Sequence, residues 1–122
     1  MPDANPDEGN PILSELMQED PSYEGLVADF VGRLADRVTQ LEGAIRAADF
    51  EAIRVTAHQL KGSGGGYGYP IITDVAAKLE RQATGEALDD CINAITELRS
   101  ITGRVEEGFH GSNASAGKQS TG

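Results

Sequence analysis

The stretch LVADFVGRLADRVTQLEGAI, residues 26–45, decides the fold of this chain. Its apolar side chains recur every three or four residues, a spacing that puts them on one face of an α-helix: Leu26, Val27, Phe30, Val31, Leu34, Val38, Leu41 and Ile45. Charged side chains occupy the opposite face. The pattern predicts one long amphipathic helix, and we expect Ser22 to cap its amino end.

Three more amphipathic helices follow, joined by short connections. Asp49 is suited to cap the first, and Pro70 suits the first turn of the second. The first ends within the glycine run of residues 62–68, where each glycine lowers helix propensity by about 1 kcal/mol relative to alanine. The expected core positions are Phe50, Ile53, Ala57 and Leu60; then Ile71, Ile72, Val75, Ala76, Leu79 and Ala83; then Leu88, Ile92, Ile95, Leu98, Ile101 or Thr102, and Val105.

These helices predict an all-α fold, an antiparallel up-down-up-down four-helix bundle over residues 11–110. PILSELMQED, residues 11–20, predicts a short extra N-terminal helix that covers one end of the bundle. Residues 1–10 are rich in Pro, Asn and acids, so we expect a disordered acidic segment. Residues 111–122 are small and polar, which is typical of a flexible tail.

Composition excludes several classes of protein. The net charge of -10 and the lack of a basic run leave no cationic surface for nucleic acid. No apolar stretch approaches the roughly 20 residues that span a bilayer, and the first residues do not resemble a signal peptide, so we expect a soluble, cytoplasmic protein. The single cysteine, Cys91, is expected in the core, no metal-ligand spacing is present, and the charged outer faces favour a monomer.

His58 is the side chain with the strongest chemical signal. Because Ala57 belongs to the buried stripe, His58 is expected to face solvent. Its neighbours one turn away are Arg54, Lys61 and Gly62, so we expect no acid on its immediate patch. Nearby cations disfavour the imidazolium and can balance phosphoryl oxygens, while Gly62 leaves room for a phosphoryl group and a partner. The group therefore predicts a phosphoryl-acceptor site.

The segments AHQLKGSGGGYG, residues 57–68, and AAKLE, residues 76–80, resemble the histidine-containing phosphotransfer (HPt) domains of multistep His-Asp phosphorelays. The resemblance implies a four-helix bundle in which His58 is phosphorylated, Lys61 contacts the phosphoryl group and Gly62 clears space for it. Five further residues are candidate contacts for the phosphoryl group or a partner: Arg54, Gln59, Lys78, Arg81 and Gln82.

The resemblance also implies a function. His58 would take a phosphoryl group from the phospho-aspartate of a receiver domain and pass it to another receiver's aspartate, and the partners would be receiver domains and a hybrid sensor kinase. The receiver would supply Mg²⁺, with no cofactor bound by this chain. Since no ATP-binding motif occurs, we predict a phosphoryl carrier without autonomous kinase activity.

Two alternatives remain open at this point. One is a helical interaction module that binds receiver domains through the same face without being phosphorylated. Burial of His58, or a hydrogen bond from its ring to a carboxylate on another helix, would favour that reading. The other is a structural subunit, which would show a large exposed apolar stripe.

Overall fold

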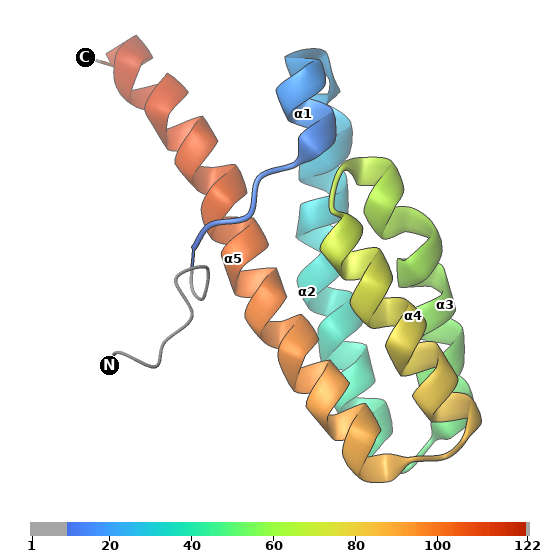
Figure 1. The fold of residues 1–122 in the computed structure, drawn as a ribbon. Coiled ribbons are helices and arrows are strands. Elements are labelled where there is room, and N and C mark those ends of the chain that lie inside the picture. The colour runs from blue at the N-terminus through green and yellow to red at the C-terminus, as the bar shows by residue number, and fades with distance from the viewer. Residues whose placement is uncertain (1–9, 122) are drawn as a thin grey trace, which may run out of the picture.

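Every regular element in the described part of the chain, residues 10–121, is a helix in this computed structural model (Figure 1). The expected disordered segment falls, but for Asn10, outside the described residues. The elements are α1 (Glu15–Glu19), the 3₁₀ turn η1 (Pro21–Tyr23), α2 (Glu24–Arg46), α3 (Phe50–Gly64), the 3₁₀ turn η2 (Gly65–Tyr67), α4 (Pro70–Thr84) and α5 (Leu88–Thr121).

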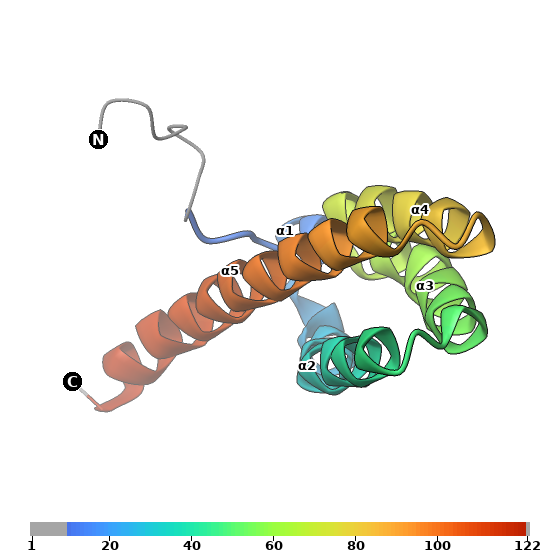
Figure 2. The same cartoon turned by 90° about the horizontal axis from the view of Figure 1, so that it is seen from below.

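The four long helices form the predicted antiparallel bundle. Helix α2 packs against α3 and α5, and α4 packs against the same two helices, so α2 and α4 occupy opposite corners (Figure 2). Short connections between successive helices make each one antiparallel to the next (Figure 1). The prediction of an all-α four-helix bundle is confirmed.

The core follows the predicted stripes closely. Helices α2, α3 and α4 bury most of the expected side chains, with Ile45, Phe50 and Ile71 half-buried at the edge of the core. Helix α5 adds Cys91 and Ala94 to Ile95, Leu98, Ile101 and Val105. Tyr69, the residue before α4, is also enclosed, and burial raises the pKa of its phenol to about 12. On the rim, Arg99 of α5 donates hydrogen bonds of 3.0 and 2.7 Å to the Glu42 carboxylate of α2.

Three of the expected core residues lie at the surface. Leu26, Leu88 and Ile92 are 54%, 42% and 41% exposed. In α5 the small side chains of Cys91 and Ala94 face the core instead, so the buried stripe is rotated away from Leu88 and Ile92. Apolar spacing alone does not resolve which of two neighbouring stripes faces inward when small residues can also serve as core.

The predicted cap at Ser22 is wrong. The Asp20 carboxylate accepts a hydrogen bond of 3.0 Å from the Ser22 backbone N–H and caps η1, and α2 then begins after Tyr23 without a side-chain cap. Helical structure starts at Pro21, before the predicted cap at Ser22, because the fixed φ of proline suits the first position of a helical turn. The Asp49 cap of α3 and the Pro70 start of α4 are confirmed.

The N-terminal helix α1 covers the end of the bundle where α3 turns into α4 (Figure 1). Ser14 caps α1 and donates a hydrogen bond of 2.7 Å to the Tyr67 carbonyl, and Glu15 N–H donates one of 2.9 Å to the Gly68 carbonyl. At the other end of the sequence, α5 continues to Thr121 and so extends into residues 111–122, where a flexible tail is expected. Side chains beyond His110 lie outside the described residues, so the flexible tail stays a prediction.

Nowhere in the described part of the chain is a helix both long and apolar enough to cross a membrane.

Candidate functional site

His58 projects from the middle of α3 into solvent. The helix is fixed by its buried face of Ile53, Ala57 and Leu60, and His58 comes one residue after that face. Its side chain is 64% exposed, as the sequence predicts.

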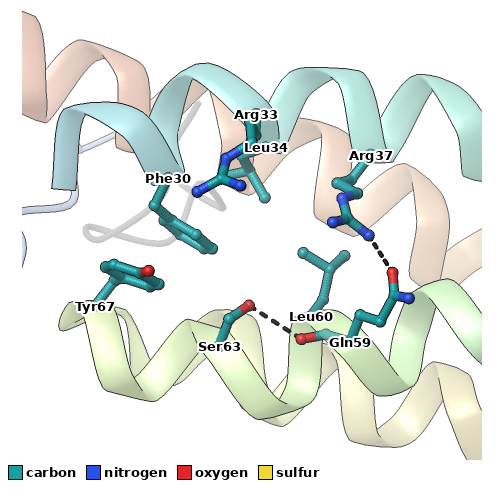
Figure 3. Close-up of a pocket in the computed structure, with 8 residues that line it drawn as sticks. All are labelled: Phe30, Arg33, Leu34, Arg37, Gln59, Leu60, Ser63 and Tyr67. Atoms are coloured by element: carbon teal, nitrogen blue, oxygen red, sulfur yellow. Dashed lines mark hydrogen bonds between the residues drawn. The ribbon is translucent and has the colours of Figure 1, made fainter. Parts of the chain in front are cut away.

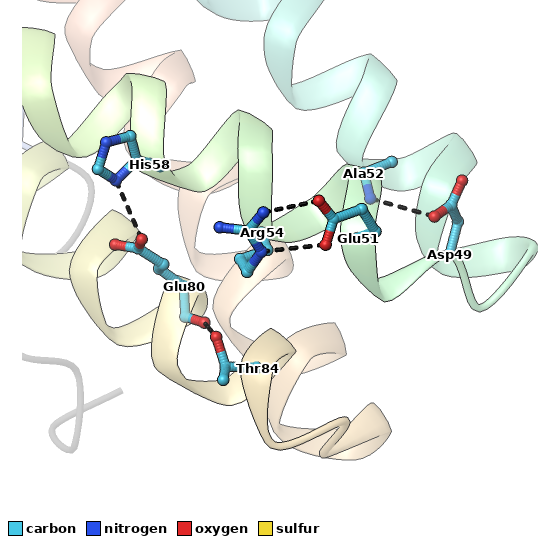
Figure 4. A network of polar contacts seen from close by, with 7 residues as sticks. All are labelled: Asp49, Glu51, Ala52, Arg54, His58, Glu80 and Thr84. Carbon is cyan, nitrogen blue, oxygen red and sulfur yellow. Dashed lines mark hydrogen bonds and ion pairs between the residues drawn. The ribbon is translucent and has the colours of Figure 1, made fainter.

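The immediate patch of His58 does contain an acid, which corrects the sequence-based expectation. Glu80, on the neighbouring helix α4, places Oε2 3.0 Å from His58 Nδ1 (Figure 4). Its Oε1 lies 2.7 Å from Lys61 Nζ. The expectation was wrong because spacing along α3 reports only neighbours within that helix, whereas Glu80 arrives by packing of α4 on α3.

Glu80 determines which ring nitrogen of His58 is available. The pKa of the Glu80 carboxyl is lowered, first by the hydrogen bond from Lys61 and further by the one with His58. The carboxylate is therefore ionised near neutral pH and only accepts, so Nδ1 carries the proton and donates it. In the neutral ring Nε2 then holds the lone pair, and Figure 4 shows the second nitrogen turned away from Glu80.

The contact between Glu80 and His58 bears on the alternative of an interaction module that is not phosphorylated. The contact is one of the two signs expected to favour a module that is not phosphorylated, and it is present. The second sign is absent, since His58 is not buried. Because the carboxylate engages only Nδ1, the contact orients the ring and leaves the Nε2 nucleophile free.

Lys61 and Gly62 lie on the same side of α3 as His58. Lys61 shares the Glu80 carboxylate with His58, which puts its ammonium beside the ring. Apart from its chain neighbours and the backbone of its own helix, a Cβ added at Gly62 would meet no atom of the described residues within 4 Å, so the space next to His58 is open. A histidine, an ammonium and an unobstructed approach thus meet on one surface.

The other candidate contacts face different neighbours. Arg54 forms a two-pronged pair with Glu51 of its own helix, at 3.1 and 2.6 Å (Figure 4). The Gln59 amide oxygen accepts a hydrogen bond from Arg37 of α2, on the side of α3 away from α4. Gln59 is therefore turned away from the His58–Glu80 pair, whereas Arg54 lies near it: the pKa of the Arg54 guanidinium is raised mainly by Glu51 and to a smaller extent by the charge of Glu80.

The three candidates on α4 also differ in direction. The Nζ atom of Lys78 lies 3.2 Å from Oε1 of Glu97 on α5, so the Lys78 side chain points away from α3. The amide oxygen of Gln82 is buried, whereas Arg81 is exposed. A contact role for Lys78 or Gln82 would require its side chain to leave this position, and the roles of all five candidates stay predictions.

Sequence reasoning missed Glu80 as a site residue. The signal was the segment AAKLE, in which Lys78 was singled out and Glu80 was noted only as part of the resemblance. Lys78 and Glu80 are two residues apart on a helix, so they point to opposite sides. One of them had to face α5 if the other faced α3.

The fold and this site define a class of protein: an all-α bundle that displays a surface histidine beside a lysine and an open glycine position. The chain belongs to the Hpt domain family, because the family model for the Hpt domain matches residues 25–108. Domains of this family are phosphocarriers of His-Asp phosphorelays and interact with receiver domains. Comparisons with curated proteins and with solved structures gave no match.

Proposed function

We propose that His58 is the phosphorylated residue of this chain and that it relays a phosphoryl group between receiver aspartates. The observation that carries the proposal is the exposed imidazole whose Nδ1 is held by Glu80 at 3.0 Å, leaving Nε2 toward solvent. The receiver supplies Mg²⁺ and the aspartyl phosphate, and a hybrid sensor kinase supplies the phosphoryl group to the relay. The chain acts as a cytoplasmic monomer in this proposal.

The transfer balances with the groups at the site. The Nε2 lone pair forms the new N–P bond while the P–O bond to the receiver aspartate breaks, and the electron pair leaves with that carboxylate. Nδ1 keeps its proton, so the phosphorylated ring carries a positive charge that Glu80 balances. Lys61 leaves the Glu80 carboxylate and donates to a phosphoryl oxygen, which neutralises charge where it develops. The reverse steps return the group to a second receiver.

The chain allows a clean test because it has only two histidines. Phosphoramidate should add one phosphoryl group to the wild-type chain, as an acid-labile, base-stable label seen by mass spectrometry and localised to His58. His58→Gln should remove the label, whereas the control His110→Gln should keep it. Label that persists on His58→Gln refutes the assignment, and receiver binding without any label would establish the interaction module instead.

Glu80 is a positioning residue in this proposal, so its variant needs a readout beyond rate. Glu80→Gln replaces an obligate acceptor with an amide that can donate or accept. Imidazole ¹⁵N shifts should report Nδ1–H in the wild type and a mixture of tautomers in the variant, with labelling slowed about tenfold because the nucleophile is less well oriented. Unchanged ¹⁵N shifts would show that Glu80 does not select the tautomer.

A further inference from the structure

A groove runs between α2 and α3, on the side of α3 away from Glu80. Its floor is apolar and includes Phe30 and Tyr67, whose rings stack with centroids 4.8 Å apart. Its rim is polar, formed by Arg33, Arg37, Gln59 and Ser63 (Figure 3). A site with an apolar floor and a few converging polar groups is suited to receive a side chain of a partner.

The groove adjoins the His58 site. Gln59 directly follows His58 in α3, and its amide oxygen accepts the hydrogen bond from the Arg37 guanidinium (Figure 3). One turn further along α3, the Ser63 hydroxyl donates to the Gln59 carbonyl at 3.0 Å. A protein that reaches His58 from solvent therefore meets the rim of the groove on one side of the histidine.

In the described part of the chain, Arg37 lacks the carboxylate partner that other cationic side chains near the groove and His58 have. Lys61 is paired with Glu80, Arg54 with Glu51 and Arg33 with Asp29. Within the described residues, Arg37 pairs with the neutral Gln59 amide and has no carboxylate within 4.0 Å. An unneutralised guanidinium on the rim of an apolar groove attracts a negative group, and this chain is otherwise acidic, with a net charge of -10.

We propose that this groove is a specificity subsite for the receiver domain, in which Arg37 binds an Asp or Glu side chain on the receiver surface. The inference rests on the proposed function, because it assumes that a receiver docks at His58. The receiver's carboxylate replaces Gln59 as the partner of Arg37, and its methylene groups pack on the Phe30 and Tyr67 rings.

The test compares three full-length variants with the wild type: Arg37→Glu, Arg37→Lys and the control Arg46→Glu. Arg46 undergoes the same charge change as Arg37, but nine residues further along α2 it lies on the opposite face of the helix. Each chain is first phosphorylated with phosphoramidate, and transfer is then measured to receiver domains of the source organism that accept the group from the wild type.

Phosphoramidate should label all four chains at equal rates, because the small donor does not use the groove. In the transfer step, Arg37→Glu should raise KM for the receiver about tenfold with kcat little changed, and should weaken the salt dependence of transfer. Arg37→Lys should retain most of the wild-type KM, and Arg46→Glu should match the wild type.

The outcomes separate this inference from the function on which it rests. No label on wild-type His58 overturns the proposed function itself. Normal labelling with an unchanged KM for Arg37→Glu overturns only the subsite, as does equal loss in Arg46→Glu, which would indicate a general effect of charge. Normal labelling with no receiver able to accept the group overturns the choice of partner. If Arg37→Glu instead dissociates a dimer in sedimentation, the groove binds a second copy of this chain.

Discussion

Gly62 and Gly64 lie two residues apart in α3, and they face opposite surroundings. A Cβ at Gly62 would project into open space beside His58, whereas one at Gly64 would lie 3.0 Å from the Cβ and Cγ2 atoms of Ile72 and from the Thr73 backbone nitrogen. The comparison shows that one glycine-rich segment serves two purposes. Its first glycine leaves access to the histidine, and its later glycines let α4 and α1 approach closely.

The packed half of the segment is held by a small network of hydrogen bonds. The Thr73 hydroxyl of α4 accepts from Gly65 N–H at 2.8 Å and donates to the Lys61 carbonyl at 2.9 Å. The Gly64 carbonyl accepts from Tyr69 N–H at 2.9 Å. These bonds satisfy backbone groups that the end of α3 would otherwise leave unpaired, so the helix can stop and reverse in a few residues.

The largest expected effect is at Gly68. Its φ of +92° lies in the left-handed region, and an added Cβ would overlap Ser14 Oγ and the backbone nitrogens of Glu15 and Leu16. Gly68→Ala should lower the free energy of unfolding by roughly 3 kcal/mol or more, measured by urea denaturation. Gly66→Ala, with open space around its Cβ, is the matched control and should change it little. Equal stability of the two variants would contradict the requirement for glycine at position 68, in the turn between α3 and α4.

Gly64→Ala should have the next largest effect. Its Cβ would press on Ile72 and Thr73, so α4 must shift, and the gain in helix propensity offsets only part of that cost. We expect a loss of about 1–2 kcal/mol in the same urea experiment. A gain in stability would mean that α3 and α4 can separate at this point without cost.

Gly62→Ala should have the opposite effect on stability and should also slow the transfer of the phosphoryl group. Stability should rise by up to about 1 kcal/mol because an exposed helical glycine is replaced, while phosphoryl transfer from a receiver should slow about tenfold because the approach to His58 is narrowed. Gly103→Ala on α5, also with open space at its Cβ, should stabilise similarly without slowing transfer. Slowing in both variants would assign the loss to rigidity instead of access.

The smallest effect concerns the pH dependence of stability at Glu80. Its pKa in the folded chain lies below the ordinary value of 4.5, mainly because of Lys61, so its contribution to stability is present above about that pH. The contribution is lost as pH falls through the lower, folded pKa. The stability difference between wild type and Glu80→Gln should therefore be larger at pH 7 than at pH 3, and a difference independent of pH would contradict the ion pair with Lys61.

The sequence by itself determined the four helices, most of the core and the exposure of His58. Those features depend on the period of an α-helix, which relates residues three and four apart without reference to the rest of the fold. The adjacency of Lys61 and Gly62 to His58 has the same origin. The prediction of which apolar side chains face the core was wrong at Leu26, Leu88 and Ile92, which are exposed. At these positions small or neighbouring residues could face the core equally well.

Only the tertiary structure decided the contacts between helices. Glu80 reaches His58 from α4, Arg37 reaches Gln59 from α2, and Ile72 rests against Gly64, each across a separation of at least eight residues. These contacts depend on how far each helix is rotated about its axis and how closely its backbone approaches the next. Helical periodicity constrains the rotation loosely and the distance not at all, so the partner that orients the imidazole emerges only when the bundle is assembled.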